Sequence, residues 1–286
     1  MSGPAGRGHL GLVLITKAPT AGLAKRRLGE QIGPQAAAAV ARVLLDHTLT
    51  VCLDVGLPVH GVYSGTRSAL PSRPGVTWRP TRGDDPVAAV LAAFRDLAGA
   101  YERLVAVPSD VPGLSRDYLT AAAAALDRCD MVLGPSRDGG LVLLGAAGPL
   151  PAELRHVRAS SGRLHDDVLA CCTERGLVVG SLAPLTDLDS WWSVSRAIDE
   201  GELREGSELH ARLVRAMRAS RSGGGAADQL DDVRPGAARG GIAGERGDDR
   251  AREVVGHDRL PARHGRQRRR RQPCRGDVVD PDHGQV

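Results

Sequence analysis

Short runs of apolar residues alternate along the chain with longer segments in which apolar residues recur at helical spacing. The runs predict buried strands at Leu10–Ile15, Val59–Tyr63, Val76–Trp78, Leu104–Val107, Met131–Leu133, Leu141–Leu144 and Leu177–Leu182. The longer segments predict helices at Pro34–Leu53, Pro86–Leu97, Arg116–Leu126, Gly162–Glu174, Leu188–Asp199 and Glu208–Arg218. Such an order indicates an α/β domain, with a mostly parallel sheet that helices cover on both faces.

The composition changes near Ser220 and sets the domain limits that we expect. Residues 219–286 contain 14 Arg against 11 Asp plus Glu, a net charge of +3 out of the formal +4 of the whole chain. This segment has no aromatic residue and few large apolar ones, so it cannot bury enough surface to offset its ordering entropy. We expect a flexible N-terminus at 1–9, one folded domain over 10–218 and a disordered tail over 219–286.

Other features of the composition exclude several classes of protein. Only 2% of the residues are aromatic, which leaves few stacking platforms for single-stranded nucleic acid. The Arg-rich run Arg266–Gln272 could bind nucleic acid or an acidic surface, but we prefer the interpretation as a solvated tail, and nucleic acid is not an expected partner. No run of apolar residues reaches the length of a membrane span, and Leu10–Ile15 is too short for the core of a signal peptide. We expect a cytoplasmic protein that does not enter a membrane.

The only two lysines of the chain, Lys17 and Lys25, follow the first predicted strand, and Arg26 and Arg27 come directly after them. Ligands of parallel sheets bind beyond the carboxyl ends of the strands, and four cations at that position suit a polyphosphate. Gly22 lets the backbone of the same loop approach a ligand closely. The alternative is a solvated basic loop.

Two further loops at the same edge of the sheet carry carboxylates. Asp110 follows the strand Leu104–Val107 in the segment Ser109-Asp110-Val111-Pro112, where a single carboxylate could bind Mg²⁺ or Mn²⁺ together with substrate phosphates. The alternative role of Asp110 is a turn former or helix cap. Asp138 precedes Gly139 and Gly140, and it suits either an acceptor-binding or base carboxylate or an ordinary hairpin turn.

These segments together resemble a family of bacterial glycosyltransferase-A-like proteins that includes arsenosugar-biosynthesis-type and radical-SAM/selenodomain-associated glycosyltransferases. The segment Ile15–Leu28 is similar to the family pattern Ala-Lys-x-Pro-x-x-Gly-x-x-Lys-Thr-Arg-Leu, and Ser109–Leu114 is similar to Ser-Asp-Cys-Pro-Gly-Leu. Leu133–Gly145 resembles Leu-Gly-Pro-x-x-Asp-Gly-Gly-Tyr-Tyr-Leu-Ile-Gly, and Asp187-Leu188-Asp189 resembles a closing Asp-(Val/Ile)-Asp. The resemblance covers about residues 10 to 200, in the same order.

The resemblance implies a nucleotide-diphospho-sugar transferase (GT-A) fold and assigns roles to individual residues. Lys25 and Arg27 would contact the phosphates of the nucleotide, with Lys17, Gly22, Arg26 and Ser109 beside them. Asp110 would bind Mg²⁺ or Mn²⁺. The sugar or acceptor side would hold Asp138 as the catalytic carboxylate, with the substrate-binding residues Gly139, Gly140, Ser160 and Ser161.

The chain departs from the family pattern mainly on the sugar and acceptor side. Leu141 and Val142 replace paired aromatic residues, and Ala159-Ser160-Ser161 stands where the family often has Trp-Ser-Thr. In the first motif, Arg26 replaces a threonine. The expected activity is therefore a metal-dependent glycosyltransferase that uses a nucleoside-diphosphate sugar and a small-molecule acceptor of open identity. The alternative is a nucleotidylyltransferase similar to the 2-phospho-lactate guanylyltransferases, which joins a nucleoside triphosphate to a phosphorylated acceptor.

Overall fold

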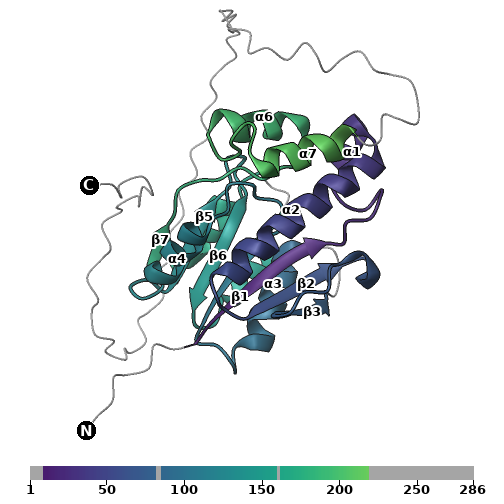
Figure 1. Ribbon diagram of the computed structural model, residues 1–286. Coiled ribbons are helices and arrows are strands. Elements are labelled where there is room, and N and C mark those ends of the chain that lie inside the picture. The colour runs from purple at the N-terminus through teal and green to yellow at the C-terminus, as the bar shows by residue number, and fades with distance from the viewer. Residues whose placement is uncertain (1–8, 82–84, 160–161, 219–286) are drawn as a thin grey trace, which may run out of the picture. The chain divides into compact units, whose positions relative to one another are not determined.

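The computed structural model describes residues 9–81, 85–159 and 162–218 and contains a seven-stranded sheet in the order β3-β2-β1-β4-β6-β5-β7 (Figure 1). The strands are β1 (Leu10–Lys17), β2 (Val59–Ser64), β3 (Val76–Pro80), β4 (Arg103–Pro108), β5 (Met131–Pro135), β6 (Leu141–Ala147) and β7 (Val179–Ser181). The helices are α1 (Arg26–Ile32), α2 (Pro34–Asp54), α3 (Pro86–Leu97), α4 (Arg116–Ala125), α5 (Leu164–Glu174), α6 (Trp191–Asp199) and α7 (Glu208–Arg218), with 3-10 turns η1 (Arg67–Ala69) and η2 (Ala152–His156). The expected α/β architecture is confirmed. The tail predicted over 219–286 lies outside the described residues.

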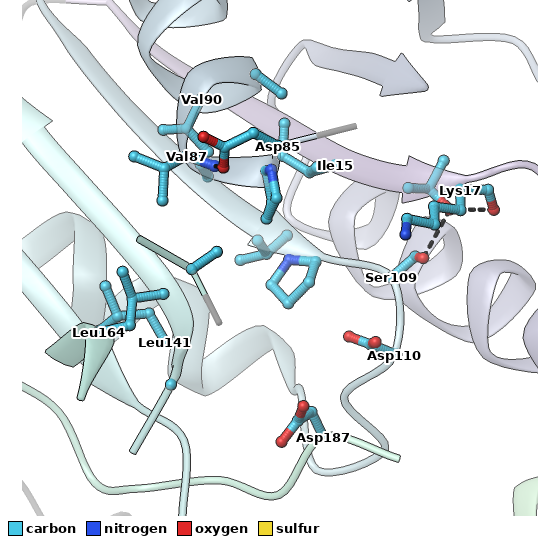
Figure 2. Close-up of a pocket in the computed structure, with 18 of the residues that line it drawn as sticks. Ile15, Lys17, Asp85, Val87, Val90, Ser109, Asp110, Leu141, Leu164 and Asp187 are labelled. Carbon is cyan, nitrogen blue, oxygen red and sulfur yellow. Dashed lines mark hydrogen bonds between the residues drawn. The ribbon is translucent and has the colours of Figure 1, made fainter. Parts of the chain in front are cut away.

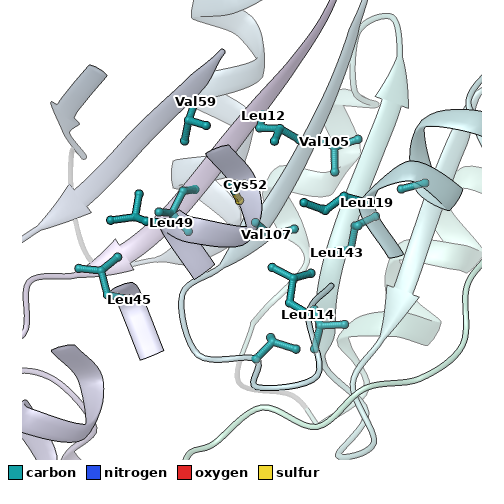
Figure 3. Close-up of a cluster of buried hydrophobic side chains, with 14 of the residues drawn as sticks. Leu12, Leu45, Leu49, Cys52, Val59, Val105, Val107, Leu114, Leu119 and Leu143 are labelled. Carbon is teal, nitrogen blue, oxygen red and sulfur yellow. The ribbon is translucent and has the colours of Figure 1, made fainter. Parts of the chain in front are cut away.

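Alternation of side chains along the central strands divides the core between the two faces of the sheet. Leu12 and Leu14 of β1 join one cluster with residues of α2 and α4, and Val13 joins a second cluster with residues of α3 and α5. Figure 3 shows the first cluster, in which Leu49 of α2 lies against the sheet. Both faces are thus covered by helices, as the uninterrupted apolar strands predict.

One strand runs against the others. β6 pairs antiparallel with both β4 and β5, and β5 and β6 form a hairpin through residues 136–140. The hairpin that the Asp-Gly signal allowed is therefore present. It brings the Asp138 segment back to the edge of the sheet where β5 ends.

Helix α1 is the main element that hydrophobic periodicity did not predict. It is only seven residues long and buries a single side chain, Leu28. Leu28 lies in a third cluster with residues of α2, α6 and α7, which includes Leu44, Leu188 and Leu213. This cluster packs α6 and α7 beside α1 and α2, at the end of the sheet where β1 ends (Figure 1).

Helix α2 has the length and apolar composition of a membrane span, the one such helix in the described part of the chain. Half of the apolar window is buried inside the protein, as in a core helix. Leu45, Leu49 and Cys52 of this helix are buried in the first cluster.

The strand order reverses between β1 and β4. The chain leaves β1 toward β2 and β3, and it later returns on the other side of β1 to form β4. Loops that leave the sheet in opposite directions open a crevice at the carboxyl ends of β1 and β4, the usual ligand position in this class of fold. The hydrogen bond between Thr16 Oγ1 and Ser109 Oγ, 2.7 Å long, joins the two strand ends at that point.

Candidate metal and nucleotide site

A cavity of about 660 Å³ opens at this crevice. Its walls bring together most of the residues that the sequence singled out, namely Lys17, Lys25, Arg26, Arg27, Ser109, Asp110, Asp138 and Gly140. Gly22 and Gly139 lie outside its lining, and Ser160 and Ser161 lie outside the described residues. Figure 2 shows Asp110 and Asp187 at one end of the cavity, with Lys17 and Ser109 beside them.

Three carboxylates meet at this end of the cavity. Oxygen atoms of Asp110, Asp187 and Asp189 lie within 4.8 Å of one another. The backbone N–H of Leu188 donates to the carbonyl of Asp110 over 2.9 Å, which ties the two segments together. Leu188 itself is fully buried in the third cluster, so both flanking carboxylates can project toward Asp110. Asp110 lies just beyond the end of β4, as its position in the sequence predicts, whereas Asp187 and Asp189 had no predicted role.

Lys25 compensates part of this negative charge. Its Nζ donates to Asp110 Oδ2 over 2.6 Å and to Asp189 Oδ1 over 2.9 Å. The side chain is only 6% exposed. Burial alone would lower the pKa of Lys25, but the two carboxylates outweigh it and raise the pKa above its ordinary value. Lys25 is therefore charged, and in this structure it binds carboxylates of the cluster.

The backbone of Lys25 is also unusual. With φ 51° and ψ 49° it is left-handed, and no other non-glycine residue in the described ranges has a positive φ. For a side-chain-bearing residue this conformation costs about 1–2 kcal/mol. The two ion pairs and the burial of the side chain hold the residue in place. Strain of this kind is typical of functional positions.

The two remaining carboxylates have opposite electrostatic surroundings. Burial and the neighbouring Asp110 carboxylate raise the pKa of Asp187 to about 6, although the hydrogen bond from Ser136 Oγ, 2.6 Å from Asp187 Oδ1, opposes the rise. The Lys25 ammonium holds the pKa of Asp189 below its ordinary value against the effect of burial. One carboxyl thus titrates near neutral pH while its neighbour stays ionised.

This donor set fits a divalent cation. Three carboxylates and one ammonium carry a net charge of −2 when all are ionised, and oxygen ligands are those that Mg²⁺ and Mn²⁺ prefer. Burial and, after it, repulsion by the neighbouring Asp110 raise the pKa of Asp187, and a bound cation would relieve the repulsion. Asp110, Asp187 and Asp189 are the residues that would bind the ion.

The remaining cations lie at the mouth of the cavity. Lys17 ends β1 and is exposed. Arg26 and Arg27 are exposed in the first turn of α1, rather than in an open loop as the sequence suggested. Gly22, with φ 78°, makes the turn that leads into this helix. Exposed guanidinium groups beside a carboxylate cluster can bind phosphates that also contact a metal ion.

The hairpin turn holds Asp138 at the cavity wall. Asp138 Oδ1 accepts a 2.9 Å hydrogen bond from the backbone N–H of Gly140. Gly139 has φ 91°, and a β-carbon there would collide with the carbonyl oxygen of Gly162. Gly139 therefore has a structural reason for its identity. Asp138 remains the group of this turn that can act on a ligand.

A buried carboxylate that the sequence did not reveal joins the loops of the site. Glu202 follows α6, and its side chain is only 7% exposed. Its Oε1 accepts from Arg137 Nε over 2.9 Å, and its Oε2 accepts from the backbone N–H of Thr186 over 2.6 Å. The same side chain packs closely against Gly113. Glu202 thus contacts the segments that carry Asp110, Asp138 and Asp187.

Comparison with known proteins supports the fold. A family model described as "Uncharacterized protein conserved in bacteria (DUF2064)" matches residues 43–161. A crystal structure from Desulfovibrio desulfuricans G20, of a protein provisionally named a nucleotide-diphospho-sugar transferase, is similar with a TM-score of 0.65. The two sequences are 22% identical, and the match covers 73% of this chain and 96% of the other. The chain therefore has a fold of the nucleotide-diphospho-sugar transferase type. No curated protein is significantly similar to it.

Two further solved structures are more distant. A nucleotidyl transferase from Methanothermobacter thermautotroptrophicus has a TM-score of 0.45 and 18% identity, with 68% of this chain and 98% of the other covered. Rv0371c from Mycobacterium tuberculosis H37Rv, in complex with manganese, has a TM-score of 0.42 and 16% identity, with 67% and 98% covered. At these TM-scores neither structure supports an inference about this chain.

Proposed function

We propose that the protein transfers a sugar from a nucleoside-diphosphate sugar to a small-molecule acceptor, with Mg²⁺ or Mn²⁺ held by Asp110, Asp187 and Asp189. The observation that carries the proposal is the three-carboxylate cluster beside exposed cations, at the carboxyl edge of the sheet. The fold shared with the Desulfovibrio protein is consistent with this chemistry. Fold alone does not assign it, because one fold supports many activities.

The cations at the cavity mouth would bind the diphosphate of the donor. Arg26 and Arg27 are exposed and can each present two N–H groups to phosphate oxygens, and Lys17 adds a third charge. When bound, a divalent ion stabilises the negative charge that develops on a departing diphosphate. Lys25 binds Asp110 and Asp189 and holds both carboxylates in place for that ion. Lys25, Asp110 and Asp189 are held in position by their ion pairs before the donor binds, which is the condition for electrostatic catalysis.

Asp138 would act on the acceptor. Its carboxylate lies in the cavity wall, and the hydrogen bond from Gly140 fixes the position of one oxygen. A carboxylate at this place can accept the proton of an attacking hydroxyl if the reaction inverts the sugar configuration. We expect Asp138→Asn to lower kcat by 10²-fold or more with little change in KM for the donor.

Turnover measurements with Mn²⁺ and a panel of sugar nucleotides test the proposal. The wild-type protein should release a nucleoside diphosphate from at least one of them, and Asp110→Ala should abolish the metal-dependent part of the rate. Unchanged metal-dependent turnover in Asp110→Ala would refute the assignment. Incubation with nucleoside triphosphates and phosphorylated acceptors provides the second arm. Release of pyrophosphate there would identify the alternative, a nucleotidylyltransferase.

A further inference from the structure

The cavity has two chemically different ends. The end near β1 and β4 carries the carboxylates and cations already described. The other end, here called the apolar lobe, is lined by aliphatic side chains of β6, α5 and the segment around η2: Leu141, Leu144, Leu150, Leu154, Leu164 and Val168. Figure 2 shows Leu141 and Leu164 together on one side, across the cavity from Val87 and Val90. The two ends belong to one continuous space.

Several side chains of the apolar lobe are not packed away from solvent. Leu154 and Val168 are buried, but Leu141, Leu144, Leu150 and Leu164 are only half-buried at the open side of the second core cluster. Aliphatic groups that stay accessible inside a concave surface gain free energy when an apolar molecule covers them. The lobe is therefore suited to an apolar ligand.

The described side chains of the lobe also disfavour a hydroxyl-rich occupant. The six side chains that define it have no hydrogen-bonding group, so a sugar placed there would lose bonds to water without replacement. No aromatic residue lines the cavity in the described part of the chain, so no ring is available to stack against a sugar. Three further polar side chains of the cavity, Ser64, Thr81 and Asp85, lie toward β2, β3 and α3. That side can pair with the edges of a base, which leaves the lobe to the other substrate.

We propose that the acceptor carries an aliphatic body, which binds in the apolar lobe and directs its polar reacting group toward Asp138 and the carboxylate cluster. This inference rests on the proposed function, because the bound molecule is an acceptor only if the protein is a transferase. The binding of an aliphatic group in the lobe can be measured independently of any reaction. Leu141 is the side chain at the junction, because it directly follows the Asp138-Gly139-Gly140 turn.

Calorimetric titration of the metal-free and nucleotide-free protein with n-alkanols from butanol to octanol tests the lobe. Each methylene group removed from water should raise the affinity about fourfold until the lobe is filled. Glucose, which carries many hydroxyl groups, should not bind. A parallel titration with octyl phosphate compares a phosphate with a hydroxyl as the polar group on the same alkyl chain, and so distinguishes the two groups that could supply the reacting oxygen of the acceptor. Affinity that does not rise with chain length would overturn the proposal.

Two leucines of α5 provide a matched pair of variants. Leu164→Ser places a hydroxyl in the lobe and should weaken octanol binding at least tenfold. Leu169→Ser alters an exposed leucine of the same helix that does not line the cavity, and it should bind octanol like the wild type. Equal binding by the two variants would contradict the assignment. Leu141→Phe enlarges the side chain in the lobe without adding a polar group and should also abolish the dependence on chain length, which keeps the test valid if Leu164→Ser is unstable.

These titrations separate the lobe from the proposed activity. No metal or nucleotide is present, so the result does not depend on Asp110, Asp187 or Asp189. Absence of Mn²⁺ binding or of sugar transfer would refute the proposed function and leave the aliphatic site standing. Absence of chain-length dependence would refute the aliphatic site and leave the metal site standing.

Discussion

At the residue scale, Lys25 combines a left-handed backbone, a nearly buried ammonium group and two carboxylate partners. Its charge balances part of a cluster that would otherwise bring three carboxylates together. A divalent cation would share the same carboxylates. The stability of the metal-free protein and its response to metal are therefore linked through this side chain.

Replacing Lys25 by methionine should make that link visible. The change leaves Asp110 and Asp189 without their partner. Because these carboxylates are 24% and 46% exposed, solvent screening makes the loss smaller than the about 3–5 kcal/mol of a fully buried ion pair. We expect Lys25→Met to lower the Tm strongly in EDTA and to recover part of the loss when Mn²⁺ is added, as measured by calorimetric melting. Lys17→Met, at an exposed lysine, should change the Tm little. A Lys25→Met protein as stable as the wild type in EDTA would show that the ammonium does not balance the cluster.

Asp187 makes stability depend on pH. Its pKa is raised to about 6 in the folded protein from 3.8, so the folded state binds this proton more tightly than the unfolded state. The resulting stabilisation is complete below about pH 4 and is lost as the pH rises through 6. Two pKa units correspond to about 1–3 kcal/mol. Asp187→Asn keeps a hydrogen-bond acceptor for Ser136 and should therefore remove this part of the pH dependence.

Chemical unfolding of metal-free wild type and Asp187→Asn between pH 4 and pH 8 checks this expectation. The variant should gain stability relative to the wild type as the pH rises through 6. Parallel pH profiles of the two proteins would show that Asp187 is not the titrating group.

At the scale of the elements, the packing around Glu202 fixes how the three loops of the site meet. Arg137 binds both Glu202 and the more exposed Glu200, with Nη2 of the arginine 3.0 Å from Glu200 Oε2. Glu200 and Glu202 therefore allow the contributions of two carboxylates that bind the same arginine to be compared. Only Glu202 also binds the backbone beside Asp187, through Thr186.

Glu202→Ala should lower the free energy of unfolding by about 3 kcal/mol, because it leaves buried donors without acceptors. Glu200→Ala removes a partly exposed ion pair and should cost at most about 1 kcal/mol. Equilibrium unfolding in urea measures both. In the proposed metal site, Glu202→Ala should also weaken Mn²⁺ binding, since Thr186 precedes Asp187. Equal costs for the two alanine variants would mean that Glu202 does not join the loops.

The sequence predicted most elements because local signals mark them. Proline at the first position begins α2 and α3, the side chains of Asp85 and Ser115 accept hydrogen bonds at the starts of α3 and α4, and apolar runs identify the strands. Helix α1 escaped prediction because it is short and buries only Leu28, and that burial depends on α6 and α7. The last strand is also shorter than its apolar run, because only Val179–Ser181 pairs with β5.

The sequence predicted only those residues of the site that directly follow neighbouring strands of the sheet. Asp110 follows β4 and the basic residues follow β1, and adjacent parallel strands bring these loops together. The pairing of Lys25 with Asp189 joins residues 164 positions apart, across segments that no periodicity relates. Glu202 carries no local signal, because its role depends on Arg137 and Thr186, which reach it through the tertiary fold.

At the scale of the whole molecule, all the interactions described above lie within residues 9–218. The domain limits drawn from composition place the Arg-rich segment 219–286 outside the functional unit. We therefore expect a chain that ends at Arg218 to keep the Tm and the Mn²⁺ affinity of the full chain within experimental error. Deletion that abolishes ligand binding, and removes most of its dependence on salt, would assign the function to the tail instead.

If Asp110, Asp187 and Asp189 form a site for a divalent cation, Mn²⁺ must bind there, and titration followed by electron paramagnetic resonance measures that binding. The control variant is Asp117→Asn, which alters an exposed carboxylate of α4. We predict that wild type and Asp117→Asn bind one Mn²⁺ with equal affinity, that a nucleoside diphosphate strengthens this binding, and that Asp110→Asn weakens it at least tenfold. Binding of Mn²⁺ by Asp110→Asn with wild-type affinity, or no binding by the wild-type protein with or without nucleotide, would contradict the account.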